Sequence, residues 1–584
     1  MHELHANTNK QMPRRKEIPY AITNFESLRT ENYLYVDKTR FIEMLENESS
    51  KHHFLIRPRK FGKSLFLSVL EHYYDIRFKD RFDELFGDLY IGQNPTKNAN
   101  KYFVMNFNFS GINTLDLESF KTSFTTAIKD SIVDFLTEHS EIIKEVDVLT
   151  NKLDLLNDVR AFVRFAFNVI KRLNKKAYVI IDEYDHFAND IIAKGTVMST
   201  EQFNKSVWAN SITRDFYETL KAGAKTVVDK IFITGITPIM LDDITSGFNI
   251  SENFSLEARY NEILGLTRKE VEWVMEQIQL DRSLISIDLE KMYDGYLFHR
   301  KAENKLFNST MILNYFKGLL SSGKDFEDLV DKNLKTDYGR IRNLINKSNN
   351  KQKIRELIEN KFVNSAVAKQ FSMELIHEDE NFYSLLFYMG LVTIDNSNPT
   401  NFALKVPNIS IKTMYWEFIK RMLTEELEGL SVDNSRYLGP IRSLAYDNEY
   451  KSFFEYFSKN IVSYLSNRDL QNTVEKDMKF LLLPMFIDNY YFPFSELENS
   501  SGYSDIYLQR NQLHPHTISE WVFELKYVKQ SEATDNDLID ARKNEAITQL
   551  RAYKSSNMFK NRTDVRFLAV VFVGKTDYFV EEVF

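Results

Sequence analysis

Three neighbouring residues, Gly62, Lys63 and Ser64, have the types and spacing that bind phosphate. They stand in the segment FLIRPRKFGKSLFLSVL (54–70), between a strand-like apolar run and a pattern with helical periodicity. Backbone N–H groups at a helix start bind phosphate oxygens, and glycine lets the backbone come close. In such a loop the lysine bridges two phosphates and the serine holds Mg²⁺. The pattern predicts a nucleotide site, with an ordinary strand–helix turn as the alternative; the expected contacts are Arg59, Gly62, Lys63, Ser64 and Leu65.

One position of this loop departs from the full phosphate-loop pattern GxxxxGK[ST]. The first glycine of that pattern is replaced by Arg57. Because one standard element of the loop is missing, the sequence leaves open whether a bound nucleotide is hydrolysed.

A second motif places two carboxylates at the end of a buried strand, in the segment YVIIDEYD (178–185). Asp182 is placed to hold Mg²⁺ through water, and Glu183 to orient and polarise the attacking water. The alternative is a solvated acidic loop after a buried strand. A later strand, 230–234, ends in Thr234, where many ATPases place a residue that senses the γ-phosphate.

A third group has the pattern of a metal-dependent nuclease. In the segment 502–526, Asp505 falls in one strand and Glu524-Leu525-Lys526 ends the next. In an antiparallel pair the two carboxylates meet at one edge, and side chains at i and i+2 share a face. Two carboxylates hold Mg²⁺, or Mn²⁺ in its place, while a lysine activates water and neutralises phosphate charge. A degenerate nuclease fold remains an alternative, because the Glu-x-Lys triplet is very common.

These motifs need particular elements to position them. Buried strands alternating with helical patterns predict a parallel sheet flanked by helices. The order of phosphate loop, extra strand, acidic strand and sensor strand fits the additional-strand class of P-loop ATPases. The expected strands are 53–57, 102–107, 177–182 and 230–234.

The pattern of the chain changes twice after this region. A helix and turn at 383–394, followed by 402–407, have an order compatible with a winged-helix unit. Strands are then expected at 503–508, 520–525 and 566–573, with helices at 471–487 and 539–554. The predicted organisation is α/β and multidomain: a flexible tail (1–16), a P-loop ATPase domain (17–265), a helical connector with a winged-helix unit (266–450) and a nuclease-like domain (451–584).

Composition and charge limit the class of protein. The chain has 584 residues, 43% hydrophobic and 27% charged, which is typical of a globular protein. Its net charge of −8 excludes a general polyanion binder, so nucleic acid would need a local patch. Lys332–Lys361 is one such candidate, with a solvated helical face as the alternative.

The absence of cysteine excludes disulfides, thiolate zinc sites and thiol catalysis. The longest apolar runs are about eight residues, whereas a membrane-spanning helix needs about twenty. The first residues have no apolar core of a signal peptide. A cytoplasmic protein without a membrane partner is therefore expected.

Five segments together resemble the AAA-ATPase-like family, whose members usually carry a C-terminal PD-(D/E)XK nuclease domain. The resemblance implies ATP as the nucleotide, and arginine at position 57 is typical of the family. Asp37 and Lys38 match a motif ahead of the loop and are either nucleotide contacts or a structural ion pair. The segments are YLYVDKTRFI (33–42), FLIRPRKFGKSL (54–65), VIIDEYDHF (179–187), FITGITPIMLDDITSGFN (232–249) and ILGLT (263–267).

The C-terminal segments FSELENSSGYSDIYL (494–508), WVFELK (521–526) and AITQLRAY (546–553) resemble the nuclease motifs of the same family. The resemblance implies that Gln549 lies beside the active site. It also implies an upstream carboxylate that binds metal, for which Glu496 and Glu475 are both candidates. The family usually has Gly-Arg before the aspartate pair, where this chain has Gly502-Tyr503-Ser504.

The favoured function is nucleotide-regulated cleavage of nucleic acid, with DNA favoured over RNA, and with ATP and Mg²⁺ as cofactors. The alternative is an NTPase switch whose nuclease-fold domain only binds nucleic acid or a partner. A homo-oligomer is compatible with the sequence.

Overall fold

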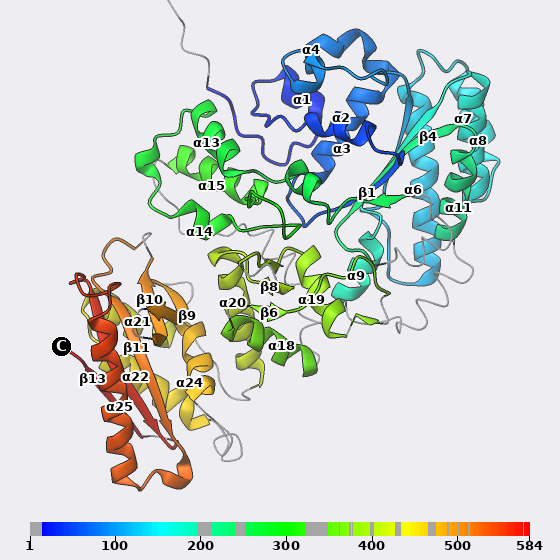
Figure 1. Cartoon of the computed structure of the whole chain (residues 1–584). Helices are drawn as coiled ribbons and strands as arrows, with labels where there is room; N and C mark the ends of the chain where they lie inside the picture. Colours follow the sequence, from blue (N-terminus) through cyan, green and yellow to red (C-terminus); the bar gives the residue numbers. More distant parts are fainter. Residues whose placement is uncertain are drawn as a thin grey trace, which may run out of the picture.

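The structure is a computed structural model of the whole chain, shown in Figure 1. It describes residues 15–194, 212–239, 251–322, 348–426, 434–464, 475–486, 490–499, 502–511, 514–575 and 577–584, apart from positions 361, 373–374, 377 and 398–401. The expected tail falls almost wholly outside these ranges, and so does the first half of the basic run Lys332–Lys361.

The N-terminal part contains a parallel five-stranded sheet, as the alternating pattern predicts. β4 lies between β1 and β3, which is the arrangement of the additional-strand class. The strand β5 is missed by the sequence pattern, because two residues are too few to show periodicity. In sheet order the strands are β2 (Phe103–Asn108), β3 (Ala177–Asp182), β4 (Val228–Gly235), β1 (His52–Ile56) and β5 (Glu252–Asn253).

Helices cover this sheet (Figure 1). α6 (Leu117–Glu138), α8 (Val159–Arg172) and α11 (Ile212–Ala224) pack on one another and against β2 and β4. α3 (Lys63–Tyr74) follows β1 directly and packs against β3. A short loop, residues 57–62, joins β1 to α3 and therefore lies at the carboxyl edge of the sheet.

A small helical lid follows the sheet. It consists of α13 (Arg268–Gln277), α14 (Leu289–Tyr293) and α15 (Ser309–Ser322), which have a hydrophobic core of their own. Thr267 and Glu270 form a capping box that fixes the start of α13. The lid borders the N-terminal sheet domain at the end of β1 (Figure 1).

The middle unit has the strand order and pairing of a winged helix. α18 (Ser348–Glu359), β6 (Val363–Asn364) and α19 (Asp379–Tyr388) precede a hairpin of β7 (Thr393–Ile394) and β8 (Ala403–Lys405), and β6 pairs with β8. After an exposed first turn, every residue of α19 from Asn381 to Tyr388 is buried. It is therefore not displayed to solvent as a DNA-reading helix of a helix-turn-helix protein would be.

The C-terminal part is a mixed five-stranded sheet with helices on both faces (Figure 1). The parallel pair is β11 with β12, and the other pairs are antiparallel. α25 (Asn536–Lys554) packs on one face, and α22 (Lys451–Asn460) and α24 (Glu475–Leu482) pack on the other. In sheet order the strands are β13 (Asp577–Glu582), β12 (Val565–Val573), β11 (Glu520–Val528), β10 (Gly502–Arg510) and β9 (Tyr491–Asn499).

The sequence pattern correctly predicts the three inner strands and the helices α24 and α25, but it does not predict α22 or the edge strands β9 and β13. An edge strand has one neighbour and one solvated side, so its alternation is weak. Among the described residues, no helix combines the length and the apolar character needed to cross a membrane.

Candidate functional site

The phosphate-loop residues converge at the start of α3. Gly62 has φ +100°, a conformation that favours glycine, and it stands one residue before the helix. The ammonium of Lys63 donates to the carbonyls of Arg57 (3.0 Å) and Pro58 (2.9 Å) at the start of the same loop. Burial lowers the pKa of Lys63 to about 8, although Asp182 and other nearby carboxylates oppose this shift.

The two expected magnesium-binding side chains are in direct contact. The hydroxyl of Ser64 donates to Asp182 Oδ2 at 2.7 Å. Asp182 ends β3 and is buried, and burial raises its pKa while the bond from Ser64 opposes the rise. Mg²⁺ prefers oxygen ligands, and the hydroxyl of Ser64 in the first turn of α3 and the carboxylate of Asp182 at the end of β3 are ligands of this kind.

Glu183 follows Asp182 in a left-handed backbone conformation, with φ +51°. One of its carboxylate oxygens lies 2.9 Å from Nδ1 of His186, which begins α9 (His186–Lys194). Burial would raise the pKa of Glu183, but the bond and charge of His186, with Lys63 and Arg59, hold it below its ordinary value. The side chain is therefore an ionised carboxylate facing the loop, as a group that polarises water must be.

The expected sensor residue, Thr234, bonds to the neighbouring strand, and its role as a sensor stays a prediction. Thr234 is buried, and its hydroxyl donates to the carbonyl of Leu55 at 2.6 Å. The end of β4 is held instead by Asp185, which accepts from the backbone N–H and hydroxyl of Thr237 at 2.6 and 2.8 Å. This role of Asp185 was not predicted from the sequence, although the residue lies only three positions after the end of the buried strand.

Arg57, at the position of the missing glycine, points away from the phosphate side. Its guanidinium is fully buried and donates to the carbonyls of Ile56 (2.9 Å), Ser255 (2.7 Å) and Tyr260 (2.7 Å). It also lies 4.0 Å from the centre of the Phe298 ring. Burial lowers the pKa of Arg57 to about 9. The arginine therefore ties the start of the loop to the segment that contains Ser255 and Tyr260.

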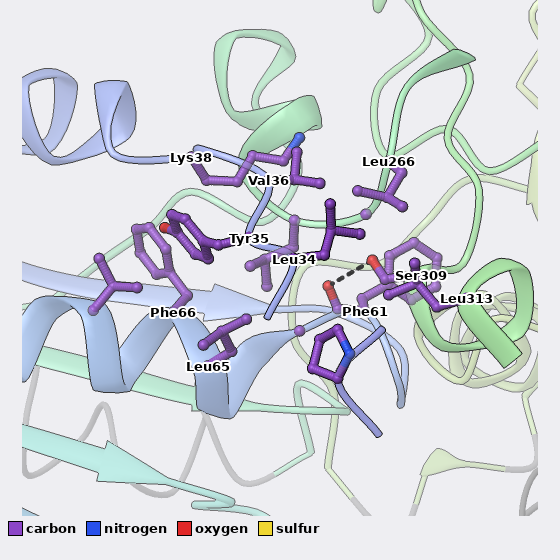
Figure 2. Close-up of a pocket in the computed structure, with 15 residues that line it drawn as sticks. Leu34, Tyr35, Val36, Lys38, Phe61, Leu65, Phe66, Leu266, Ser309 and Leu313 are labelled. Atoms are coloured by element: carbon purple, nitrogen blue, oxygen red, sulfur yellow. Dashed lines mark hydrogen bonds between the residues drawn. The ribbon is translucent and has the colours of Figure 1, made fainter. Parts of the chain in front are cut away.

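The lid holds the rest of the loop. Asn308 donates to the carbonyl of Arg59 (3.2 Å), and the backbone N–H of Thr310 donates to the carbonyl of Lys60 (3.2 Å). The carbonyl of Phe61 accepts from Gly265 N–H at 3.1 Å, and Ser309 reaches the same carbonyl (Figure 2). The sequence analysis missed these contacts, because nothing in the residue types ties 308–310 to a loop about 250 positions earlier.

An apolar pocket of about 100 Å³ opens beside the loop (Figure 2). Lys38 is the one charged side chain among the described residues that line it, and its ammonium is bound to both oxygens of Glu270 at 2.6 and 2.8 Å. Asp37 caps the backbone of Thr39. The sequence predicts that Asp37 and Lys38 are either nucleotide contacts or a structural ion pair. These bonds favour a structural role for both residues. The pocket is lined mainly by Leu34, Tyr35, Val36, Phe61, Gly62, Leu65, Phe66, Leu266 and Leu313.

The second cluster forms where β10 and β11 pair. Ile506 is opposite Phe523, so Asp505 and Glu524 are cross-strand neighbours. Asp505 Oδ2 accepts from the backbone N–H of Leu525 at 2.8 Å, and Glu524 Oε1 accepts from the ammonium of Lys526 at 2.9 Å. Burial raises the pKa of Glu524 to about 7, with Asp505 adding to the rise and Lys526 opposing it.

Two helices bring further charges to this cluster. Glu475 of α24 lies 3.7 Å from Lys526 Nζ, and Glu545 of α25 lies 3.8 Å from the same atom. Lys479, one turn after Glu475, is buried with its ammonium 3.9 Å from Asp505 Oδ1. The sequence analysis missed Lys479 and Glu545; for Lys479 the i, i+4 spacing from Glu475 was the available signal.

Of the two upstream candidates, Glu475 has a described side chain that reaches the cluster. Glu496 lies in β9, and its side chain falls outside the described part of the structure. Gln549 is on the α25 face between Glu545 and Tyr553, and its buried carbonyl oxygen has no hydrogen-bond partner among the described residues. Burial and the nearby Glu524 raise the pKa of Tyr553, which places its hydroxyl toward the same cluster.

The cluster fits a divalent cation in part. Among the described residues, no three His, Asp or Glu side chains lie close enough to share a metal ion. Glu524 Oε2, however, is buried without a hydrogen-bond partner in the described structure, and the charge of Asp505 is close enough to help raise the pKa of Glu524. Mg²⁺ takes one or two carboxylates and completes its shell with waters and phosphate oxygens, so two carboxylates are sufficient.

Comparison with known families identifies two domains in the chain. A family model described as a predicted AAA-ATPase matches residues 19–245, and one described as the PD-(D/E)XK nuclease superfamily matches residues 473–582. The chain joins an AAA-ATPase-like domain to a PD-(D/E)XK nuclease superfamily domain. The phosphate loop and Asp182 belong to the AAA-ATPase-like domain, and Glu475, Asp505, Glu524 and Lys526 belong to the PD-(D/E)XK domain.

One curated relative is an uncharacterized protein in the vnfD 5′ region of Azotobacter chroococcum mcd 1, 24% identical over 293 residues, which are 48% of this chain and 49% of the relative. The match thus spans about half the length of that relative. Two Aeropyrum pernix structures also align. The ORC2 protein in ADPNP–ADP complexes is 10% identical, with 68% of this chain and 98% of that chain covered and a TM-score of 0.30. The ORC1 protein in complex with DNA is 9% identical, with 68% of this chain and 97% of that chain covered and a TM-score of 0.26. TM-scores this low do not establish a shared fold.

The role of Arg57 gives a testable prediction. Arg57→Gly would restore the glycine of the phosphate-loop pattern, but it removes the donor from three buried carbonyls, each worth about 1–3 kcal/mol when left unpaired. We expect the apparent melting temperature of the AAA-ATPase-like domain to fall by roughly 5 °C or more. Differential scanning calorimetry measures this, with Arg59→Gly as the control in the same loop. An unchanged melting temperature in Arg57→Gly would contradict the fastening role.

Proposed function

We propose that the protein is an ATP-binding, nucleotide-regulated and metal-dependent nuclease that acts on nucleic acid, with DNA favoured over RNA. The observation that carries the proposal is the cluster of Asp505, Glu524 and Lys526 on the neighbouring inner strands β10 and β11 of the PD-(D/E)XK sheet, where Glu524 and Lys526 are buried and Asp505 is half-buried. Buried charges are costly, and a site that keeps them needs a reason. A cytoplasmic location remains a prediction from the sequence.

The phosphate loop and the apolar pocket suit the two ends of a nucleotide. The N–H groups at the start of α3 and the ammonium of Lys63 would take the phosphates, while Ser64 and Asp182 would hold Mg²⁺. The pocket beside Gly62 offers apolar walls for a flat base (Figure 2). Glu183 is positioned to polarise water for hydrolysis.

At the nuclease cluster, a bound divalent cation would supply Lewis-acid activation of the phosphate and of a water. Glu524 and Asp505 would hold the cation. Lys526 would orient the water and neutralise charge that develops on the phosphate. Gln549, one turn before Tyr553, would hydrogen-bond near the reacting group with its unpaired oxygen.

One observation favours the alternative in which this domain only binds nucleic acid or a partner. Lys526 is bound to Glu524 and close to Glu475 and Glu545, so its charge is already matched by carboxylates. The cleavage assay below separates the two functions, because a binding module retains nucleic-acid affinity without metal-dependent cleavage.

Lys63→Ala should weaken ATP binding by about 1.5–3 kcal/mol, because a charge-assisted contact with phosphate is lost. In the unaltered protein, ATP affinity should fall as pH rises through about 8, because the protonated ammonium is the form that binds phosphate and the pKa of Lys63 is about 8. Isothermal titration calorimetry measures both effects.

The matched control for Lys63→Ala is Lys60→Ala, whose side chain is exposed in the same loop and should bind ATP normally. Lys63→Ala should also lose the pH dependence. Equal ATP affinity in the unaltered protein and Lys63→Ala would remove the phosphate-loop assignment.

Glu183→Gln tests hydrolysis separately from binding. The amide cannot act as a base, so ATP turnover should fall by at least about 100-fold while ATP affinity changes little. Phosphate release and calorimetry on the same preparation provide the two readouts. Undiminished turnover would assign the water-polarising role to another residue.

Glu524→Gln and Asp505→Asn should each reduce Mg²⁺- or Mn²⁺-dependent cleavage of labelled DNA by at least about 100-fold, because both carboxylates would hold the cation. In the unaltered protein, cation affinity should rise with pH up to about 7 and then level, because below its pKa of about 7 Glu524 must lose a proton to bind metal. Cleavage rates against cation concentration at several pH values measure this.

The control for the nuclease variants is Glu532→Gln, an exposed carboxylate of the same domain, which should cleave normally. Circular dichroism checks that each variant is folded. Cleavage at an unaltered rate in folded Glu524→Gln would show that the activity belongs to another site or to a contaminant.

A further inference from the structure

The start of the phosphate loop is bonded to the side chain that would bind phosphate. The ammonium of Lys63 donates to the carbonyls of Arg57 and Pro58, and a phosphate competes for the same three N–H donors. When Lys63 turns to a β- or γ-phosphate, these two carbonyls lose donors. Carbonyls are costly to leave unpaired, so a turn of Lys63 away from them would favour a shift of the Arg57–Pro58 backbone toward other donors.

Pro58 is in direct contact with the middle unit. Gly390, just after α19, has φ +78°, and a Cβ placed there would lie 2.9 Å from Pro58 Cβ. The contact is close enough that the two segments cannot shift independently, and the proline ring keeps its own φ fixed. The next residue, Leu391, accepts through its carbonyl from the hydroxyl of Tyr415 at 3.3 Å.

From there the contacts reach the nuclease domain. Trp416, in α20 (Ile409–Glu426), is fully buried, and its ring centre lies 6.0 Å from that of Phe480 in α24. Arg355 of α18 lies 4.7 Å from the same Phe480 ring and forms an ion pair with Asp477. Two helices of the middle unit therefore hold α24 in place.

α24 itself carries two of the charged groups of the nuclease cluster. Glu475 lies 3.7 Å from Lys526 Nζ, and Lys479 lies 3.9 Å from Asp505 Oδ1. Phe480, the residue that contacts the middle unit, is the neighbour of Lys479 in the chain. A displacement of α24 by about 1 Å would be enough to change how the cluster is arranged.

We propose that α24 is the element through which the nucleotide site controls the nuclease site. Occupancy of the phosphate loop, sensed by Lys63, moves the Pro58–Gly390 contact, and Trp416 transmits this to Phe480 and α24. The inference rests on the proposed function, because it requires a nucleotide site and a nuclease site. By linkage, nucleic acid bound at the nuclease site changes ATP affinity by the same factor, commonly about 5- to 150-fold.

The test follows hydrogen exchange in α24 of the full chain, in the Glu524→Gln background so that no cleavage occurs. Exchange of peptides covering 475–486 is measured with and without a non-hydrolysable ATP analogue and Mg²⁺. We expect the analogue to change this exchange at least about fivefold in the otherwise unaltered chain, and less than twofold in Trp416→Leu. Trp416→Phe keeps an aromatic ring and disturbs the core less than Trp416→Leu, so it should give an intermediate response.

The matched control is Phe559→Leu, a buried aromatic of the nuclease domain that packs on Tyr507 and Phe567, away from this route. It should respond to the analogue as the otherwise unaltered chain does. Calorimetry on every variant shows whether the analogue binds.

Analogue binding without any change in α24 exchange would overturn the relay and leave the proposed nucleotide site standing. A full response in Trp416→Leu and Trp416→Phe would overturn the route through α20. No analogue binding to the Glu524→Gln chain would overturn both the relay and the nucleotide half of the proposed function.

Discussion

A loop that binds phosphate must keep its backbone N–H groups turned toward one side, and here a buried arginine holds it in that shape. Arg57 has its charge compensated by three carbonyls and the face of Phe298, all on the far side of the loop. Two of those carbonyls, from Ser255 and Tyr260, belong to the segment that leads into the lid. The nucleotide site therefore depends on residues some 200 positions later.

The nuclease cluster is assembled on the same principle, from elements that are far apart in the chain. The sheet supplies Asp505 and the Glu524–Lys526 pair, while α24 and α25 supply Glu475, Lys479 and Glu545. The ammonium groups stand among the carboxylates, which offsets part of the cost of burying like charges together. Burial, followed by the charge of Asp505, still raises the pKa of Glu524, although Lys526 opposes the rise.

Between the two sites, the middle unit is a spacer whose hydrophobic core is continuous with both neighbours. Its α19 is covered rather than displayed, and the close contact of Gly390 with Pro58 needs a glycine at that position. A flexible tether would be rich in Gly, Ser and Pro and would transmit nothing. An ordered, well-packed unit that contacts both the phosphate loop and α24 can couple the two sites when these contacts have two alternative arrangements.

The sequence by itself determined the order of the main strands, the strand–loop–helix around Lys63 and the strand pair that carries Asp505 and Glu524, because periodicity and short spacings are local properties. It could not determine the direction of Arg57, the role of Thr234 in pairing or the contribution of Lys479. Those depend on which distant segment lies opposite each side chain, and residue types alone do not fix such contacts. In the sequence, Arg57 is only a departure from the phosphate-loop pattern. The tertiary structure shows that it stabilises the loop, because folding brings the carbonyls of Ser255 and Tyr260 to its guanidinium.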